Sequence, residues 1–210
     1  MDFSIRNHWL ELDEPNEEVS LTRAPERISH PIVPEVVVIH YGVLSDLDAL
    51  IAGQRATGYW AHLSIDGKRS TGADHQIFQS TAFNDRGSHA GRSAYKGRPS
   101  VNGFSVGIEI ANPGPLIEHP DGTLRTVNGD EWDPCDAEEA RHKHPYAPRN
   151  WTWWAKYSPE EIALIVSSCR ALHEEYGLKD IVGHHDIAPG RKFDPGPLFP
   201  LEQVKDEVLL

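Results

Sequence analysis

Residues 158–185 read SPEEIALIVSSCRALHEEYGLKDIVGHH, and this stretch combines one helix with one buried strand. Ser158 and Glu161 have the spacing of a capping box, with a proline at the first helical position between them. Apolar residues then recur at helical spacing, so we expect a helix over 159–176. The short apolar run at 180–185 is typical of a strand.

The upstream half of the chain adds further strands of the same kind. The clearest is 104–111, FSVGIEIA, in which Phe104, Val106, Ile108 and Ile110 share one face. The other expected elements are strands at 35–41, 59–65 and 75–79, a polar turn at Asp66-Gly67, and short helices beginning at Ser45 and near 201. This mixture predicts an α/β fold, with a mixed central β-sheet and helices packed on its faces.

The length of 210 residues suits a single domain over 1–210, in which two segments depart from the regular pattern. Residues 1–30 are polar and contain prolines, so we expect them to wrap the surface. Residues 113–157 form a long decorated insertion, and its 113–140 part carries eight acidic residues against one arginine. Residues 86–98 carry four basic residues and no acidic one.

The overall charge excludes several classes of partner. Lys and Arg number 20 and Asp and Glu number 32, so a net charge of −12 disfavours nucleic acid and anionic membranes.

No apolar run approaches the ~20 residues of a transmembrane helix. The N-terminus lacks the pattern of a secretory signal, which predicts a cytoplasmic protein. Periplasmic action stays open if the protein is released by lysis or if a leader was removed. We expect a monomer.

The cysteines offer one alternative chemistry. Cys135 and Cys169 are too few for a disulfide framework. A cysteine hydrolase would have to use Cys169, but this residue falls on the apolar stripe of the helix at 159–176. A packing role is therefore expected for it.

Twelve histidines in the chain prompt a search for a metal site. His40 and His184 each end an apolar strand, where open α/β sheets place their sites. Asp194 follows in a loop rich in Pro and Gly. Two histidines and one carboxylate make a three-ligand zinc set that leaves a fourth position for water. Spacing alone does not choose between His184 and His185, or between Asp194 and Asp186.

Four motifs in a fixed order carry a family resemblance. They are Val38-Ile39-His40, Ser88-His89-Ala90-Gly91-Arg92-Ser93, Phe104-Ser105-Val106-Gly107-Ile108-Glu109, and GHHDIAPGRKFDPGP at 183–197. Over roughly residues 36–200 the chain resembles the zinc-dependent N-acetylmuramoyl-L-alanine amidases of the AmpD type, the amidase-2 family. The resemblance implies an amidase-2, peptidoglycan-recognition-like fold with Zn²⁺ as cofactor. By this match the zinc ligands are His40, His184 and Asp194.

The same resemblance implies a reaction and assigns two catalytic residues. The enzyme would cleave the amide between N-acetylmuramic acid and L-alanine in peptidoglycan or muropeptides. Glu109 would be the general base for the attacking water, and Lys192 would stabilise the oxyanion. Without the resemblance, Glu109 is as well explained as an ion-pair or solvent-facing carboxylate, and Lys192 as a solvated loop lysine.

Substrate binding is assigned to His89, Arg92 and Asn112. The basic segment 86–98 would pair with carboxylates of the stem peptide, because arginine binds carboxylates through two parallel bonds. A solvated basic face explains the same segment. The tryptophans at 151, 153 and 154 either line a sugar cleft or belong to the core.

The other histidines have no catalytic assignment. His62 is expected to be structural, and His185 to be a neighbour of the ligands. Five others are expected to be surface or packing residues: His75, His119, His142, His144 and His173.

Two alternatives stay open. A non-catalytic peptidoglycan-recognition module is the rival function. For an active enzyme, cell-wall recycling and a phage-type endolysin role are both compatible with the residues.

Overall fold

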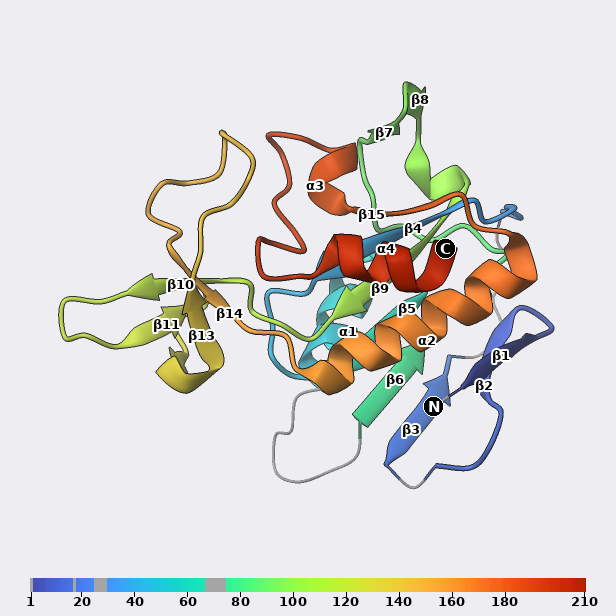
Figure 1. The fold of residues 1–210 in the computed structure, drawn as a ribbon, viewed down its shortest axis with the longest axis horizontal. Coiled ribbons are helices and arrows are strands. Elements are labelled where there is room, and N and C mark those ends of the chain that lie inside the picture. Colours follow the sequence, from blue (N-terminus) through green and yellow to red (C-terminus); the bar gives the residue numbers. More distant parts are fainter. Residues whose placement is uncertain (1, 17, 25–29, 67–74) are drawn as a thin grey trace.

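The computed structural model describes residues 2–16, 18–24, 30–66 and 75–210, and a mixed six-stranded sheet lies at its centre (Figure 1). In sheet order the strands are β15 (Asp180–Gly183), β4 (Val36–Tyr41), β9 (Ser105–Ile110), β5 (Leu63–Asp66), β6 (His75–Gln79) and β3 (Val19–Arg23). The first four run parallel, β6 is antiparallel to β5, and β3 is parallel to β6. The predicted α/β class with a mixed sheet is confirmed. The expected turn at Asp66-Gly67 falls partly outside the described residues.

Two helices, α2 (Pro159–Tyr176) and α4 (Leu201–Leu209), pack on one face of this sheet. Alternate strand residues such as Val37, Ile39 and Ile108 point into the core beneath them. The predicted capping box is present: Ser158 Oγ accepts from the Glu161 N–H at 3.1 Å, and the Glu161 carboxylate accepts from the Ser158 N–H at 2.6 Å. This local sequence therefore sets the start of α2.

The opposite face carries α1 (Leu47–Thr57) and the loops that follow β6. The cap of α1 is Asp46 and not the expected Ser45, because the Asp46 carboxylate accepts from the Ala49 N–H at 2.7 Å. Residues 94–99 form a small hairpin of β7 (Ala94–Tyr95) and β8 (Arg98–Pro99) above this face. Phe104 precedes β9 and packs with Val36 and Val38, so it does not share the face of Val106 as the alternation predicted.

The N-terminal segment does more than wrap the surface, in contrast to the expectation for residues 1–30. Strands β1 (Phe3–Arg6) and β2 (Trp9–Leu12) form a hairpin against α2, and β3 joins the central sheet. The Gln79 side chain accepts from the Leu10 N–H at 2.7 Å and ties the hairpin to β6. Apolar side chains such as Phe3 and Leu10 are buried there, and the polar composition of the segment concealed them.

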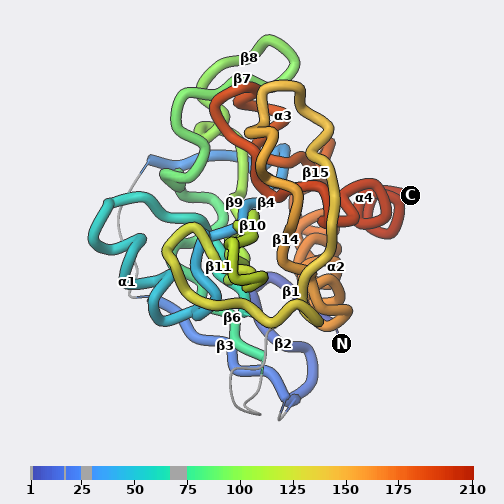
Figure 2. The backbone as a smooth tube through the Cα atoms, turned by 90° about the vertical axis from the view of Figure 1, so that its left-hand side faces the viewer, coloured from blue at the N-terminus to red at the C-terminus, as the bar shows by residue number. Residues whose placement is uncertain are grey.

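The 113–157 insertion is an ordered antiparallel sheet and not an irregular loop (Figure 2). Its strands are β10 (Pro115–Glu118), β11 (Leu124–Thr126), β12 (Glu131–Trp132), β13 (Ala137–Glu139) and β14 (Trp153–Ala155). Leu116, Leu124 and Trp132 form a separate small core, while the acidic residues between them face solvent. This alternation within very short strands was masked by the high charge of the segment.

The carboxyl ends of β15, β4 and β9 meet at one edge of the central sheet, and β15 leads directly into the one-turn helix α3 (His184–Ile187). The predicted strand at 180–185 therefore ends at Gly183. None of the helices in the described part of the chain combines the length and apolar character needed to cross a bilayer.

Candidate active site

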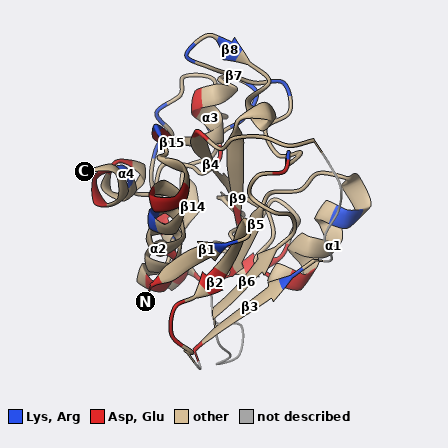
Figure 3. Ribbon diagram, turned by 90° about the vertical axis from the view of Figure 1, so that its right-hand side faces the viewer, with Lys and Arg blue, Asp and Glu red and all other residues tan. Residues whose placement is uncertain are grey.

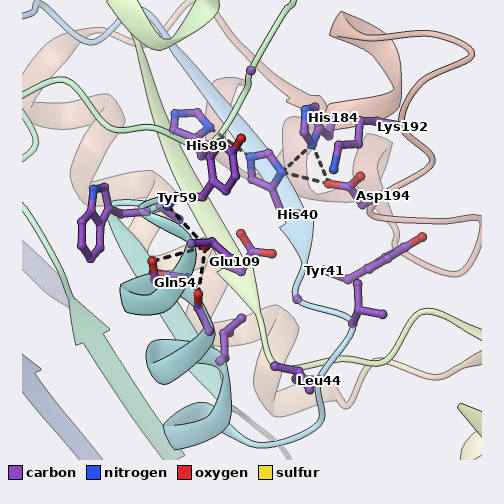
Figure 4. Close-up of a pocket in the computed structure, with 18 of the residues that line it drawn as sticks. His40, Tyr41, Leu44, Gln54, Tyr59, His89, Glu109, His184, Lys192 and Asp194 are labelled. Atoms are coloured by element: carbon purple, nitrogen blue, oxygen red, sulfur yellow. Dashed lines mark hydrogen bonds and ion pairs between the residues drawn. The ribbon is translucent and has the colours of Figure 1, made fainter. Parts of the chain in front are cut away.

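Three side chains predicted as ligands meet at this edge of the sheet (Figure 4). His40 lies near the end of β4, His184 begins α3, and Asp194 lies in the loop that follows. His40 Nδ1 is 2.8 Å from Asp194 Oδ2 and 2.9 Å from His184 Nδ1, and the distance from His184 Nδ1 to Asp194 Oδ2 is 2.9 Å. All three residues are buried. The structure thus selects His184 and Asp194 over His185 and Asp186 for this cluster.

The Nε2 atoms of His40 and His184 point away from the cluster, and each faces a hydrogen-bond acceptor. His40 Nε2 is 3.0 Å from His89 Nδ1, and His89 Nε2 is 3.3 Å from Ser105 Oγ. Because the Ser105 hydroxyl donates to the Val101 carbonyl, its oxygen accepts from His89, and His89 in turn accepts from His40. His184 Nε2 faces the Ala90 carbonyl at 3.2 Å. Each ring proton therefore lies on Nε2, and the Nδ1 lone pairs face inward.

The cluster thus brings together three electron-pair donors, which is the arrangement that a cation requires. Burial and the neighbouring His184 lower the pKa of His40 to about 4, so this ring is neutral at pH 7. Burial would raise the pKa of Asp194, but the adjacent His184 and His40 side chains outweigh it and hold the pKa well below its ordinary value. Two imidazoles and a carboxylate fit a divalent metal ion such as zinc.

Glu109 lies in the same cavity as this cluster (Figure 4). It pairs with His40 in the β4–β9 register, so both side chains leave the same face of the sheet. Burial raises the pKa of Glu109 to about 8, the charge of Asp194 adds to this effect, and the charge of Lys192 opposes it. A carboxyl group with a pKa near neutrality is suited to accept and release a proton.

Lys192 lines the cavity beside Asp194 (Figure 4). Its charge lowers the pKa of both His40 and Glu109. The Lys192 N–H donates to the Ala188 carbonyl at 3.0 Å, so α3 fixes the backbone at this position. The lysine is therefore placed to stabilise negative charge near the three ligands.

The three predicted ligands and Glu109 line an open cleft of about 810 Å³. Such a volume suits a ligand with several functional groups. One wall comes from α1 and the residues after it, including Gln54, Tyr59 and Trp60, and the other comes from Trp151 and Phe193. Trp151 thus lines the cleft, whereas Trp154 is buried and Trp153 packs with the core of the insertion.

The basic segment 86–98 lies around β7 and β8 (Figure 3), but only Arg92 of its four basic residues lines the cleft. Arg98 pairs with Glu35 at 2.8 Å, and the Lys96 ammonium lies 3.7 Å from Asp180. Arg191 contributes a further guanidinium, which donates to the Ala90 and Arg92 carbonyls at 2.8 Å and braces the loop. The four basic residues of the segment were expected to bind carboxylates together, but in the structure only Arg92 among them is placed to do so.

Two residues expected to bind substrate have other contacts. Asn112 is not among the residues that line the cleft; its buried side chain accepts from the Gly114 N–H at 2.8 Å and donates to the Lys156 carbonyl at 3.1 Å. It therefore shapes the turn after β9. His89 does line the cleft, but its ring nitrogens contact His40 and Ser105, which gives it a role in orienting a ligand.

Two further expectations concern buried groups. His62 Nδ1 accepts from the Gly107 N–H at 3.0 Å, and its Nε2 donates to the Asp85 carbonyl at 2.8 Å, which confirms a structural role. Cys169 lies in the main core, and burial raises the pKa of its thiol to about 12. A thiol that stays protonated at neutral pH is a poor nucleophile, so the cysteine-hydrolase alternative is not supported.

The sequence did not indicate that Tyr59, Trp60 and Arg191 line the cleft. It also did not indicate that His142 and His144 lie near the loop that carries the predicted ligands. The aromatic pair follows the end of α1 and has no motif around it. His142 and His144 contact the His185 ring, with centroids 5.2 and 4.9 Å away. Only the tertiary fold of the insertion brings them there.

Comparisons with known proteins show which family this chain resembles. The family model described as N-acetylmuramoyl-L-alanine amidase (Amidase_2) matches residues 30–197. The chain is 27% identical over 190 residues to the N-acetylmuramoyl-L-alanine amidase AmiD of Escherichia coli K12, covering 89% of this chain and 57% of AmiD. It is 29% identical over 141 residues to the 1,6-anhydro-N-acetylmuramyl-L-alanine amidase AmpD of the same strain, covering 66% of this chain and 56% of AmpD. The chain thus spans little more than half the length of these relatives.

Solved structures show the same fold. E. coli AmiD in complex with anhydro-N-acetylmuramic acid-L-Ala-D-γ-Glu-L-Lys superimposes with a TM-score of 0.60 at 23% identity, over 98% of this chain and 65% of that chain. AmpDH3 of Pseudomonas aeruginosa in complex with anhydromuramic pentapeptide superimposes with a TM-score of 0.61 at 24% identity, over 86% and 63% of the two chains.

Proposed function

The chain belongs to the N-acetylmuramoyl-L-alanine amidase family Amidase_2, and from this premise we propose that it hydrolyses the amide bond between N-acetylmuramic acid and L-alanine. The observation that carries the proposal is the convergence of His40, His184 and Asp194 beside Glu109 in one cleft. A metal-ligand set next to a carboxylate of raised pKa is the arrangement that amide hydrolysis requires.

We propose zinc as the metal that His40, His184 and Asp194 hold. The neutral imidazoles and the single carboxylate are preferred zinc ligands, and three protein ligands leave a position open for chemistry. When bound, zinc supplies a Lewis acid that acidifies a water molecule and polarises the substrate carbonyl. His89 and the Ala90 carbonyl support the proposal, because they fix the two rings from outside the cluster.

Glu109 acts as the general base and then as the general acid. Its carboxylate takes a proton from the attacking water and passes it to the nitrogen of the departing L-alanine. A pKa of about 8 in the buried carboxyl favours both the uptake and the release of the proton near neutral pH. The Lys192 ammonium stabilises the negative charge that develops on the carbonyl oxygen.

The proposed substrates are soluble muropeptides in preference to intact sacculi. Arg92 supplies an exposed positive charge at the cleft, whereas the net charge of −12 disfavours a large anionic wall. The structural neighbours AmiD and AmpDH3 hold anhydromuramic peptides, which are small fragments like the soluble muropeptides proposed here. Faster turnover of soluble fragments than of sacculi supports a recycling role, and the opposite order supports an endolysin role.

The test uses chelator-stripped protein and a muramyl peptide, with mass spectrometry to follow release of the free peptide. Zinc should restore activity, and His184→Ala should lose activity together with the zinc bound at the cleft. His119→Ala removes a histidine from the insertion, away from the cleft, and should retain both. Turnover after thorough chelation, or normal zinc content in His184→Ala, would overturn the assignment.

A non-catalytic recognition module remains the rival function. Loss of a ligand or of the base would favour it, but all three ligands and Glu109 are present in this chain. Tight binding of the muramyl peptide by zinc-loaded protein, with no peptide released, would favour the rival.

A further inference from the structure

We propose that His144, His185 and Asp186 form a second divalent-metal site, separate from the cluster in the cleft. One ligand atom from each residue lies within 4.8 Å of the other two. The site joins two distant segments, because His144 lies between β13 and β14 of the insertion and the other two residues lie on α3 (Figure 2). This proposal does not rest on the proposed function.

His185 has one ring nitrogen available for a metal. The residue is 3% exposed, and its Nδ1 lies 2.9 Å from the backbone carbonyl of Asp194. A carbonyl only accepts, so Nδ1 carries a proton, and in the neutral ring Nε2 carries a lone pair. Nε2 is buried and makes no hydrogen bond. A histidine that donates one ring N–H to a carbonyl and presents the other nitrogen is typical of metal ligands.

Asp186 presents one oxygen to the same place. Its Oδ2 accepts from the Gly183 N–H at 2.9 Å, which holds the carboxylate over the start of α3. Its Oδ1 lies 3.3 Å from His185 Nε2 and 3.4 Å from the Lys143 ammonium. The Lys143 side chain is 60% exposed, so it can leave the carboxylate when a metal ion supplies the positive charge.

His144 completes the set, and its neighbour His142 does not belong to it. His142 Nδ1 accepts from the His144 N–H at 3.1 Å, and its Nε2 donates to the Phe193 carbonyl at 2.8 Å, so both nitrogens are occupied. His144 Nε2, by contrast, is buried without a hydrogen-bond partner. Its ring centroid lies 4.9 Å from that of His185. Two orphaned imidazole nitrogens thus adjoin one carboxylate oxygen.

The donor set indicates the class of metal. Two imidazoles and one carboxylate favour zinc, cobalt or nickel over magnesium or calcium, which prefer oxygen ligands only. A metal bound there would clamp the insertion to α3. Because His185 bonds to the Asp194 carbonyl, the clamp would also support the backbone that carries the third ligand of the cleft.

The test measures zinc by mass spectrometry in full-length protein that has been stripped with chelator, reloaded and freed of excess metal. Wild-type protein should hold two equivalents. His144→Ala and Asp186→Asn should each hold one, and the asparagine oxygen can still accept from the Gly183 N–H. His40→Ala should also hold one, which separates the two sites even if the proposed activity is absent.

Two variants act as controls for folding and specificity. His119→Ala lies in the same insertion and should keep both equivalents. Lys143→Met removes the competing cation and should tighten the second site in a cobalt titration followed by visible absorption, a gain that misfolding cannot produce. A single equivalent in wild type, retention of both in either His144→Ala or Asp186→Asn, or loss of both in His40→Ala would overturn the proposal.

Discussion

His40 and Glu109 are register partners in the parallel pair of β4 and β9. Neighbouring strands lie about 4.8 Å apart, so the sheet itself fixes the distance between a metal ligand and the proposed base. Gly107 precedes Glu109 on the same face, and a Cβ there would meet the His89 ring at 2.4 Å. The small residues of this face thus make room for the histidine that orients His40.

The first prediction separates proton transfer from metal binding. Glu109→Gln keeps the shape of the side chain but removes the base, so kcat should fall by ~10²–10⁴-fold while zinc content stays normal. Steady-state kinetics and metal analysis of the same preparation check this. Near-normal turnover would show that another group acts as the base.

The second prediction concerns the stability of the metal-free protein. The pKa of Glu109 is raised from an ordinary value of 4.5 to about 8, so ionisation of this buried group destabilises the folded state. The cost is absent below pH 4.5, grows between pH 4.5 and about 8, and is constant above. Metal-free Glu109→Gln should therefore be more stable than wild type at pH 8, by on the order of a few kcal/mol, and similar at pH 4.5.

Urea unfolding at the two pH values measures this difference. An advantage of the variant that is equal at both pH values would show that packing, and not charge, causes it.

The third prediction concerns Lys192. Lys192→Met should lower kcat by ~10²–10³-fold, because one group that stabilises the oxyanion contributes about 3–4 kcal/mol. The lysine charge also lowers the pKa of Glu109, so its removal should shift the acidic limb of kcat/KM to higher pH. Lys192→Arg should return the acidic limb most of the way to its wild-type pH. Lys96→Met removes a lysine outside the cleft and should change neither kcat nor the position of the limb. An unshifted limb in Lys192→Met would show that the Lys192 charge does not act on the pKa of Glu109.

The strand pattern predicted where the candidate ligands His40 and His184 lie, whereas the choice of Asp194 and the role of Glu109 came from the family resemblance. Alternation along 104–111 placed Glu109 opposite the apolar face, and the ends of two apolar strands placed His40 and His184 at one edge. The strand period that sets these positions is encoded in short stretches of sequence.

The roles of other residues depend on contacts between distant segments, which local sequence does not encode. His89 carries the family motif, but only the packed structure shows that its ring bonds to His40. Trp151 and Trp154 are three residues apart, yet one lines the cleft and the other is buried. His144 meets α3 only because the insertion folds into its own sheet.

The last prediction tests Arg92, the one basic residue of 86–98 that lines the cleft. It is exposed, and an exposed ion pair contributes about 0.2–1 kcal/mol. Arg92→Gln should therefore raise KM roughly two- to fivefold for muramyl peptides with free carboxylates and leave kcat unchanged, because binding is lost equally in the ground and transition states. The effect should shrink in high salt, which screens exposed charges.

Arg86→Gln, in the same basic segment but outside the cleft, should have no effect on KM. If amidated and free-acid peptides lose affinity equally in Arg92→Gln, the guanidinium does not contact the peptide carboxylates, and the wall formed by Trp151 becomes the better candidate for substrate contact.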